Sequence, residues 1–556
     1  MKDKPQSSIR LLPKWVKISA LVILFFILAG IGANFYLNGL ITRQLKKSVS
    51  SSSKGFYQLD YAKVQVNLFA RSITIDNAVL KADSSLFTTM TAMGQSSPFL
   101  LEGKFPLLKI RGIHWMKFIF SKSLVAGELL MKSPAIVLRR FKSDSVEKNI
   151  SDVQEDFQKN LRGLKINALT IADADLEYWY MQDDRVGPTV YHFKKLNLGI
   201  EDLQVNRKET DSMKNFSFDN VHFSFAEYEY RTGDSLYLMG VKNVNYLGAK
   251  KNITISQLFI RPRLTEKEHA TKLPYQMEIN DLSLENISLE GVDIISLVDQ
   301  GKINVQNALI QAGHWNVFLS RIPPPPPSKK KVVPSQKLLG ISSQISICTL
   351  NINKLQLNYR EFNTDTRKTG EIKFVDIMGR ATNVTNEKNR IQKNPHLEVD
   401  LTAKLMGTAD FKAKFDFLLD DTTGKFTVDA QLGKMDATQL NPAFIPLKKV
   451  EIKKGTLDEM KCHGSGNQNM LKGNVGLLYH DLHVPILEKD KEADTLKRRS
   501  FISLVANILV KNDNPKEDEP IRKANNVVLK REPRKSYFNL LLMGLFTGIA
   551  KIVAPK

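Results

Sequence analysis

Residues 398–405 read Glu-Val-Asp-Leu-Thr-Ala-Lys-Leu, a run in which polar and apolar side chains alternate without interruption. Successive side chains of a β-strand point to opposite faces of the sheet, so this period of two predicts a strand with one apolar and one polar face. The same alternation recurs along much of the chain, between turns rich in Asn, Asp, Gly and Lys. The sequence therefore predicts a mainly β fold, an antiparallel meander of short strands. The clearest of these strands are expected at 63–68, 72–76, 221–225, 252–255, 278–284, 425–429 and 449–452.

The apolar members of these runs are expected to share one face of the sheet. Two arrangements satisfy that pattern: a sandwich whose apolar faces pack together, or a single sheet whose apolar face stays open as a groove. A single bulge would invert the assignment within a strand. The candidates for the apolar face are Val64, Val66, Ile73, Ile75, Phe216, Phe218, Phe223, Phe225, Ile253, Ile255, Val399, Leu401, Phe426, Val428, Val450 and Ile452.

An internal repeat links two distant parts of the chain. Residues 110–113 (Ile-Arg-Gly-Ile) and 289–292 (Leu-Glu-Gly-Val) open segments that align without gaps. Each is expected to lead into a short apolar helix, at 115–119 and 294–298, then a strand, then a turn at 133–134 or 312–313. A looser third copy runs from Leu440 to Pro446 and into 450–452. Repeated units that stack bury a continuous core, so the repeat predicts an elongated body. One longer helix is also expected over 144–161.

The N-terminal region predicts a membrane anchor. No charged residue lies between Ile18 and Ala33, and Trp15 and Tyr36 flank that stretch, which gives roughly 20 residues for crossing a bilayer. Basic residues lie on both sides of this stretch, so charge alone does not set its orientation. A basic segment followed by an apolar one is the layout of an export signal, which places residues 1–15 in the cytoplasm. The alternative is a cleaved signal peptide. The residues expected within the membrane are Ile18, Leu21, Val22, Phe25, Phe26, Leu28 and Ile31.

The rest of the chain divides by composition. A run of five prolines, Pro323 to Pro327, followed by three lysines, predicts a stiff linker or loop at 323–337. The expected organisation is therefore a cytoplasmic N-terminus (1–15), an anchor (16–36), a β-rich region (38–322), the linker, a second β-rich region (338–535) and a C-terminal helix (536–556).

The C-terminal helix is apolar along one face. At about 17 residues, 537–553 is short for a membrane span, so an interfacial or partner-docking helix, a plug at the end of the sheet and a second span are the alternatives. The residues on its apolar face are Phe538, Leu541, Leu542, Leu545, Ile549 and Val553.

Composition and motifs narrow the functional classes. An apolar fraction of 42% is that of a folded protein, and a net charge of +22 suits an anionic partner such as a membrane surface. The sequence contains no P-loop, dinucleotide fingerprint, nucleophile elbow or His-Glu-x-x-His motif. Cys462 and His463 are neighbours, but adjacent strand residues point to opposite faces. We therefore expect no enzyme, no catalytic or metal-binding residues and no cofactor.

The C-terminal region resembles the AsmA family of Gram-negative bacteria, which includes TamB-like proteins. The motifs that carry the resemblance are Leu440-Asn441-Pro442, residues 450–458 (Val-Glu-Ile-Lys-Lys-Gly-Thr-Leu-Asp), 471–475 (Leu-Lys-Gly-Asn-Val), 478–484 (Leu-Tyr-His-Asp-Leu-His-Val) and the closing stretch 531–540. The closing stretch is similar to the endings of Bacteroidetes-type members. Over 1–330 the resemblance rests on the layout and the repeat, and the proline run departs from the family's pattern.

The resemblance implies a fold and a role. It implies a twisted sheet that forms a U-shaped apolar groove, called a β-taco, in the periplasm of a protein anchored in the inner membrane by one helix. It also implies a part in phospholipid transfer between membranes or in outer-membrane homeostasis, with an anionic or zwitterionic phospholipid and the inner membrane as partners and no nucleic acid. The alternative is a non-enzymatic envelope scaffold that docks a partner through its C-terminal helix.

Overall fold

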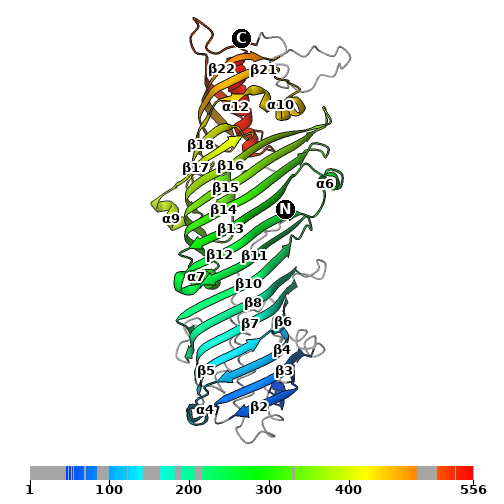
Figure 1. The fold of residues 1–556 in the computed structure, drawn as a ribbon, viewed down its shortest axis with the longest axis vertical. Helices are drawn as coiled ribbons and strands as arrows, with labels where there is room; N and C mark the ends of the chain where they lie inside the picture. Colours follow the sequence, from blue (N-terminus) through cyan, green and yellow to red (C-terminus); the bar gives the residue numbers. More distant parts are fainter. Residues whose placement is uncertain are drawn as a thin grey trace. The chain divides into compact units, whose positions relative to one another are not determined.

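The computed structural model describes residues 46–83, 99–141, 163–181, 189–206, 216–327, 332–484 and 510–554, apart from 48, 52, 54, 68, 69, 122 and 533. Strands make up 61% and helices 16% of these residues (Figure 1), which confirms the mainly β prediction. The chain forms two compact units, here called the N-terminal unit (12–257) and the C-terminal unit (258–556). The predicted anchor and the helix predicted over 144–161 lie outside the described residues. Among the described residues, no helix is both long and apolar enough to cross a membrane.

The N-terminal unit is built on strands whose pairing is mostly antiparallel. β3 pairs with β1, β2 and β4, and β4 pairs with β5 and β6. Further along, β7 pairs with β8, β8 with β9 and β10, and β10 with β11. The elements are β1 (Tyr57–Asp60), β2 (Lys63–Asn67), β3 (Ser72–Ala82), β4 (Phe99–Arg111), α4 (Trp115–Ser121), β5 (Ser123–Lys132), β6 (Ala135–Phe141), β7 (Gly163–Met181), β8 (Thr189–Asn206), β9 (Phe216–Ser217), β10 (Asn220–Arg231), β11 (Tyr237–Leu247) and η1 (Gly248–Lys250). β12 (Asn252–Pro262) crosses into the next unit.

The C-terminal unit continues with longer strands and more helices. Its described strands pair in chain order from β13 to β19, then through β21 and β22 to β23, and β20 pairs with β21. The strands are β13 (Glu278–Glu290), β14 (Ile303–Ser320), β15 (Ile345–Asn363), β16 (Lys368–Thr385), β17 (His396–Leu405), β18 (Ala409–Leu418), β19 (Phe426–Leu432), β20 (Met435–Asp436), β21 (Lys454–Gly466), β22 (Met470–His483) and β23 (Lys523–Lys530). The helices are α6 (Glu266–Lys272), α7 (Ile294–Gln300), α8 (Pro334–Leu339), α9 (Lys388–Lys393), η2 (Ala437–Leu440), α10 (Asn441–Lys448) and α12 (Tyr537–Val553).

The pairing is mixed, so the prediction of an antiparallel meander of short strands is wrong in two respects. β5 and β6 run parallel to β7, and β14 runs parallel to β15. Several strands are also long, with 19 residues in β7 and in β15. A parallel pair needs a crossover connection. The proline run lies in the connection from β14 to β15, inside the C-terminal unit and away from the boundary at 257/258.

The internal repeat is visible in the backbone. Gly112 and Gly291 both take positive φ, 67° and 66°, and in both copies the next helix connects two antiparallel strands. After that helix each copy makes a parallel pairing, with Leu124 opposite Leu164 in one and Ile303 opposite Ile345 in the other. The β-bulges also coincide, since the register shifts at Ile171, Ala174 and Leu176 in β7 and at Ile352, Leu355 and Leu357 in β15.

Bulged residues with left-handed backbone recur as well. Lys195 in β8 has φ 52° and Asp376 in β16 has φ 50°, and further along Asp202 and Asn383 have φ 49° and 58°. A bulge re-aims every side chain beyond it, so shared bulges mean that the two copies present corresponding positions on the same face. Tyr178 and Tyr359 are one such pair, opposite Leu138 and Val317 respectively.

Two local predictions differ from the structure. Ala312 and Gly313 lie inside β14 and make no turn, whereas Ser133 and Pro134 do separate β5 from β6. β14 therefore runs as one strand where the first copy has two. Residues 449–452 form an irregular segment after α10, and β21 begins only at Lys454. The cause is the end of α10, where Lys449 adopts φ 56° and turns the chain, while Asn441 bonds both backbone groups of Ile452.

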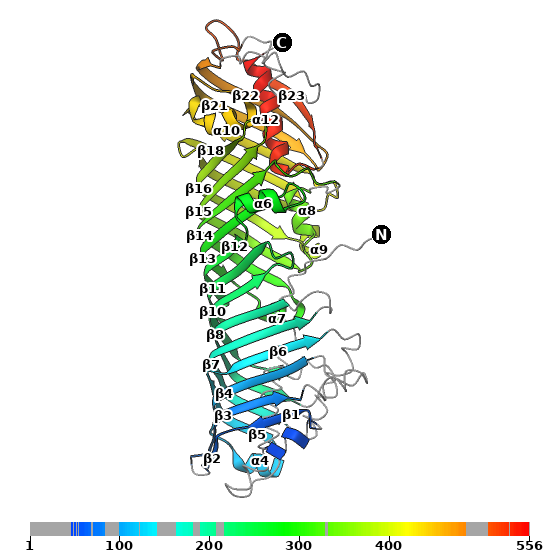
Figure 2. The same ribbon diagram turned by 90° about the vertical axis from the view of Figure 1, so that its right-hand side faces the viewer.

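The apolar side chains form separate cores in the two units. In the N-terminal unit, residues of β3 to β7 pack into one cluster in which Leu124, Leu129 and Ile166 have no exposed surface. In the C-terminal unit, two clusters draw on β17 to β23 and on α12, and Tyr479 and Ile552 are almost fully buried in one of them. α12 lies against β22 and β23, as Figure 2 shows in red. It therefore covers the apolar side of the last strands.

Candidate functional site

An almost wholly apolar cavity of about 490 Å³ lies in the C-terminal unit between the sheet and two helices, here called the C-terminal cavity. That volume is within the range typical of small-molecule sites. One wall comes from alternate residues of β16 to β19, β21 and β22, and the other from α10 and α12. Its strand residues include Phe374, Leu401, Ala403, Leu405, Phe411, Ala413, Phe415, Val428, Ala430, Leu432, Met460, Cys462, Val475 and Leu477.

Strand alternation explains the strand wall. Along β17, Leu401, Ala403 and Leu405 line the cavity, while Asp400 and Thr402 lie on the other face. Along β18, the residues that line the cavity are Phe411, Ala413 and Phe415. Because the register pairs Leu401 with Ala413 and Ala403 with Phe411, the apolar rows of neighbouring strands coincide.

α12 supplies the opposite wall. Its N-cap residue is Ser536. The side-chain oxygen of Ser536 accepts a hydrogen bond from the backbone N–H of Asn539 and so fixes the start of the helix. The residues expected on its apolar face, Phe538, Leu541, Leu542, Leu545, Ile549 and Val553, all line the cavity. The helix thus covers the cavity as part of this unit.

Two glycines let α12 approach the sheet. Gly544 and Gly548 are buried, and a Cβ added at Gly548 would lie 2.4 Å from Cγ2 of Val475. At Gly544 the added atom would lie 2.5 Å from Cδ2 of Leu471. With any larger residue at either position, the opposing side chain on β22 would have to move. We did not predict this contact, although the spacing Gly-Leu-Phe-Thr-Gly at 544–548 carries the signal for it.

The other predicted apolar residues of the C-terminal unit lie in or beside the cavity. Leu401, Val428, Val450 and Ile452 line it, the last two from the irregular segment after α10. Val399 and Phe426 pack in the adjoining cluster, where Phe426 is in contact with Phe417 and Tyr537.

The predicted residues of the N-terminal unit divide between a closed core and a more open face. Ile73 and Ile75 are each 3% exposed in the core, and Val64 and Val66 pack against it. Ile253 is buried and Ile255 is half-buried in β12. Phe218 is half-buried outside the strands, and Phe216 belongs to β9, its side chain lying outside the described part. The apolar face of this unit is therefore a packed core over β3 to β7.

An aromatic cluster follows that core on β7, β8, β10 and β11. Tyr178 stacks on Tyr191 with ring centroids 5.5 Å apart, and Phe193 stacks on Tyr228 at 4.8 Å. The predicted residues Phe223 and Phe225 join it, against Tyr246 and Phe193 respectively. Most of these rings are half-buried, so the apolar face is less tightly covered here than over β3 to β7.

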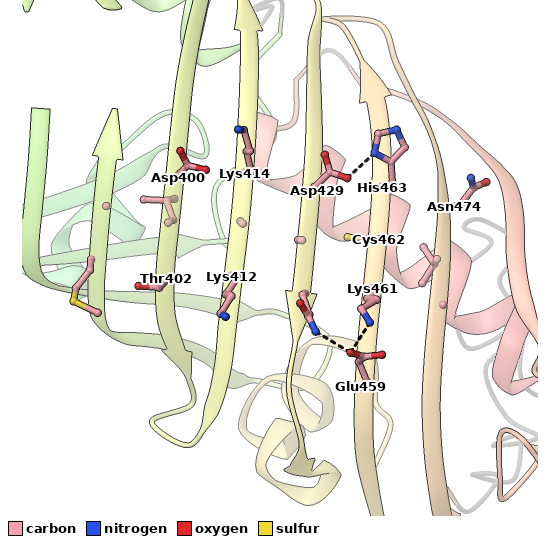
Figure 3. Close-up of a pocket in the computed structure, with 18 of the residues that line it drawn as sticks. Asp400, Thr402, Lys412, Lys414, Asp429, Glu459, Lys461, Cys462, His463 and Asn474 are labelled. Atoms are coloured by element: carbon pink, nitrogen blue, oxygen red, sulfur yellow. Dashed lines mark hydrogen bonds and ion pairs between the residues drawn. The ribbon is translucent and has the colours of Figure 1, made fainter. Parts of the chain in front are cut away.

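The outer face of the C-terminal unit is polar. A broad hollow of about 1220 Å³ lies on this face. Asp400, Lys412, Lys414 and other charged residues line it (Figure 3). Ion pairs form on it both across and along the strands: His463 Nδ1 on β21 lies 2.6 Å from Asp429 on β19, and Lys461 Nζ lies 2.7 Å from Glu459 of the same strand. Paired and exposed charges of this kind describe a solvated surface. The hollow is larger than the C-terminal cavity, but it offers no enclosed set of reactive groups.

Cys462 and His463 point to opposite faces. Cys462 lines the C-terminal cavity, where burial raises the pKa of its thiol, and His463 lies on the outer face. Within the described ranges no group of three or more His, Cys, Asp or Glu residues is placed to hold a metal ion. The C-terminal cavity itself has a lining suited to apolar groups.

Comparison with known proteins adds no relative. No family model matches the sequence, and no curated protein matches it.

Proposed function

We propose that this chain is a lipid-binding protein of the bacterial envelope, anchored in the inner membrane with its β-rich body in the periplasm, as an AsmA-family protein would be. In this proposal the C-terminal cavity holds acyl chains of a phospholipid, and the protein takes part in lipid transfer between membranes or in outer-membrane homeostasis. The observation that carries the proposal is the cavity itself, whose two walls are almost wholly apolar.

The energetics favour an acyl chain as the occupant. Each CH₂ group that leaves water for an apolar environment gains about 0.8 kcal/mol. An aliphatic chain makes no demand for hydrogen bonds, and the lining of the cavity offers almost none. A polar ligand would instead lose its contacts with water at a cost of a few kcal/mol per group. The cavity thus selects for hydrocarbon by the absence of polar partners.

The position of α12 bears on the scaffold alternative. Its apolar residues line the C-terminal cavity, and Leu540, Gly544 and Gly548 are buried against its own unit. A helix that docks a partner would need an apolar face free of such contacts. This arrangement supports lipid binding over partner docking through α12.

Lipid analysis of the full-length protein tests the proposal. The protein is purified in detergent from the membranes of a Gram-negative host, and bound phospholipid is counted by mass spectrometry. We expect stoichiometric phospholipid in the wild type. Leu401→Glu, which puts a carboxylate into the cavity, should lower it at least about tenfold, because an unpaired buried charge costs several kcal/mol.

Thr402→Glu is the matched control. It adds the same side chain to the next residue of β17, which lies on the outer face. Its lipid content should equal that of the wild type. A folded Leu401→Glu protein that retains wild-type lipid would contradict the proposal.

A further inference from the structure

A group of polar and charged side chains interrupts the apolar face beside the C-terminal cavity. It consists of Arg321 at the end of β14, Tyr359 and Glu361 on β15, and Lys448 at the end of α10, here called the rim cluster. α10 packs beside the end of β15, where Asn363 Nδ2 and Thr366 Oγ1 donate to the carbonyl of Pro446, and the charge of Glu361 acts on Lys448.

Hydrogen bonds hold most of the rim cluster in place. Arg321 Nε donates to Glu361 Oε1 at 2.7 Å, and its Nη1 donates to Gln276 Oε1 at 3.0 Å. The Tyr359 hydroxyl donates to the other carboxylate oxygen of Glu361 at 2.8 Å. The side chains of Arg321 and Glu361 remain 22% and 17% exposed.

The rim cluster adjoins the C-terminal cavity. The Tyr359 ring lies 6.1 Å from that of Phe538, and Lys448 Nζ lies 5.1 Å from the centroid of Phe546. Both phenylalanines line the cavity. Leu357, two residues before Tyr359 on the same face of β15, lines it as well. A molecule whose chains fill the cavity could therefore place its polar end at the rim cluster.

A purely structural role explains only part of this arrangement. The Arg321–Glu361 pair ties the end of β14 to β15, and Asn363 and Thr366 already anchor α10 through the carbonyl of Pro446. Lys448, on the same helix, lies over the ring of Phe546 and 3.7 Å from Met543 Sδ, where burial lowers the pKa of its ammonium group. Its Nζ therefore lies beside a residue that lines the C-terminal cavity.

We propose that the rim cluster binds the headgroup of a zwitterionic phospholipid whose acyl chains occupy the C-terminal cavity. This inference rests on the proposed function. The phosphate is held by Lys448 and Arg321, and the headgroup amine by the carboxylate of Glu361. Hydrogen bonds between ionised partners are stronger than neutral ones, so such contacts can select a headgroup where the cavity alone cannot.

The charge balance decides for a zwitterion over an anionic headgroup. Two cations, Arg321 and Lys448, face two carboxylates, Glu361 and the nearby Glu278, whose charge also acts on Arg321 and Tyr359. A headgroup with excess negative charge would meet two carboxylates with no cation left over. A headgroup that carries one phosphate and one amine matches both signs.

The test is a competition for headgroups. Full-length protein in detergent is incubated with an equimolar mixture of phosphatidylethanolamine, phosphatidylglycerol and diacylglycerol with identical chains, and the bound lipids are counted by mass spectrometry. We expect the wild type to be enriched in phosphatidylethanolamine. Lys448→Gln and Arg321→Gln should each reduce that enrichment about tenfold, the scale of one hydrogen bond to a charged group.

Diacylglycerol has no headgroup and reports on the cavity itself. Its binding should be unchanged in both variants, which also shows that they are folded. Lys354→Gln is the matched control, since it removes the same charge from a side chain on β15 that is 65% exposed. It should bind like the wild type.

The outcomes separate the two proposals. Phospholipid bound by the wild type without headgroup preference, or an unchanged preference in both rim variants, would overturn the headgroup site and leave the proposed function standing. A wild type that binds none of the three lipids would overturn both.

Discussion

At the scale of single residues, the two glycines that flank α7 show what the backbone requires there. Gly291 and Gly301 lie before and after α7, and both have φ 66°. A Cβ at Gly291 would come 2.6 Å from the side chain of Gln306, whereas at Gly301 it would meet nothing within 4 Å. Both sites therefore require a left-handed backbone, but only Gly291 also lacks room for a Cβ atom.

We predict that Gly301→Ala lowers the free energy of unfolding of the C-terminal unit by about 1–2 kcal/mol, the cost of a left-handed alanine. Gly291→Ala should cost about 1 kcal/mol more, because Gln306 must also move. Chemical denaturation of the full-length protein measures both values. Equal losses would mean that Gln306 adjusts freely.

Residue parity explains which of the predicted apolar positions reached the cavity. Alternation alone identified Leu401 and Val428, because the registers between β17 and β18 and between β18 and β19 are uninterrupted. It also identified Val450 and Ile452, which line the cavity without belonging to a strand. The charges of the rim cluster were not predicted, because they are brought together only by the ends of three elements. No local pattern in the sequence indicates that these residues of β14, β15 and α10 lie close together.

At the scale of single elements, α6 carries a pH-sensitive cap. Thr265 Oγ1 accepts from the backbone N–H of Glu268, and the Glu268 carboxylate accepts from the backbone N–H of Thr265 at 2.9 Å. That backbone bond, together with Lys272 and the Thr265 hydroxyl, lowers the pKa of Glu268 to about 2. Because the folded pKa lies below the ordinary value, the cap stabilises α6 fully above about pH 4.5 and loses this contribution as the pH falls toward 2.

We predict that amide exchange within 266–272, corrected for the intrinsic rate, becomes faster between pH 5 and 2. Glu268→Gln keeps an oxygen that can accept from Thr265 and does not titrate, so its exchange should not change over that interval. Hydrogen–deuterium exchange with mass spectrometry measures both proteins. The same pH response in both would assign the effect to another group.

Replacing Gly548 of α12 by alanine has two opposing effects on the stability of the C-terminal unit. Alanine favours a helix over glycine by about 1 kcal/mol, but at Gly548 its Cβ would collide with Val475. We predict that the collision dominates and that Gly548→Ala destabilises the C-terminal unit by about 1–3 kcal/mol. Adding Val475→Ala makes room, so the double variant should be more stable than the sum of the single changes predicts. Strict additivity in denaturation would show that the two side chains do not meet.

The elements themselves were partly predictable. Helices at Trp115, Ile294 and Tyr537 follow from short apolar runs, and the structure begins α4, α7 and α12 at these residues. The parallel pairings were not predictable, because alternation is the same in parallel and antiparallel strands. The strands also run further than the alternation suggested, since bulges such as that at Asp376 break the pattern without ending the strand.

At the scale of the whole molecule, the two units have separate hydrophobic cores. Leu129 is fully buried in the core of the N-terminal unit, and Leu477 is 2% exposed in that of the C-terminal unit. In repeat-built proteins each part is stabilised mainly by its own contacts and those of its neighbours. The two cores should therefore respond to mutation independently.

We predict two resolvable unfolding transitions in calorimetry of the full-length protein. Leu129→Ala should destabilise one unit and Leu477→Ala the other, because each change leaves a cavity in one core only. Each should lower the free energy of unfolding of its unit by about 2–5 kcal/mol and move the corresponding transition to lower temperature. Since Leu477 lines the C-terminal cavity, bound phospholipid should raise the transition that Leu477→Ala lowers and leave the other in place. A single transition that both variants shift equally would mean that the cores unfold together, and a lipid effect on the Leu129 transition would move the lipid site to the N-terminal unit.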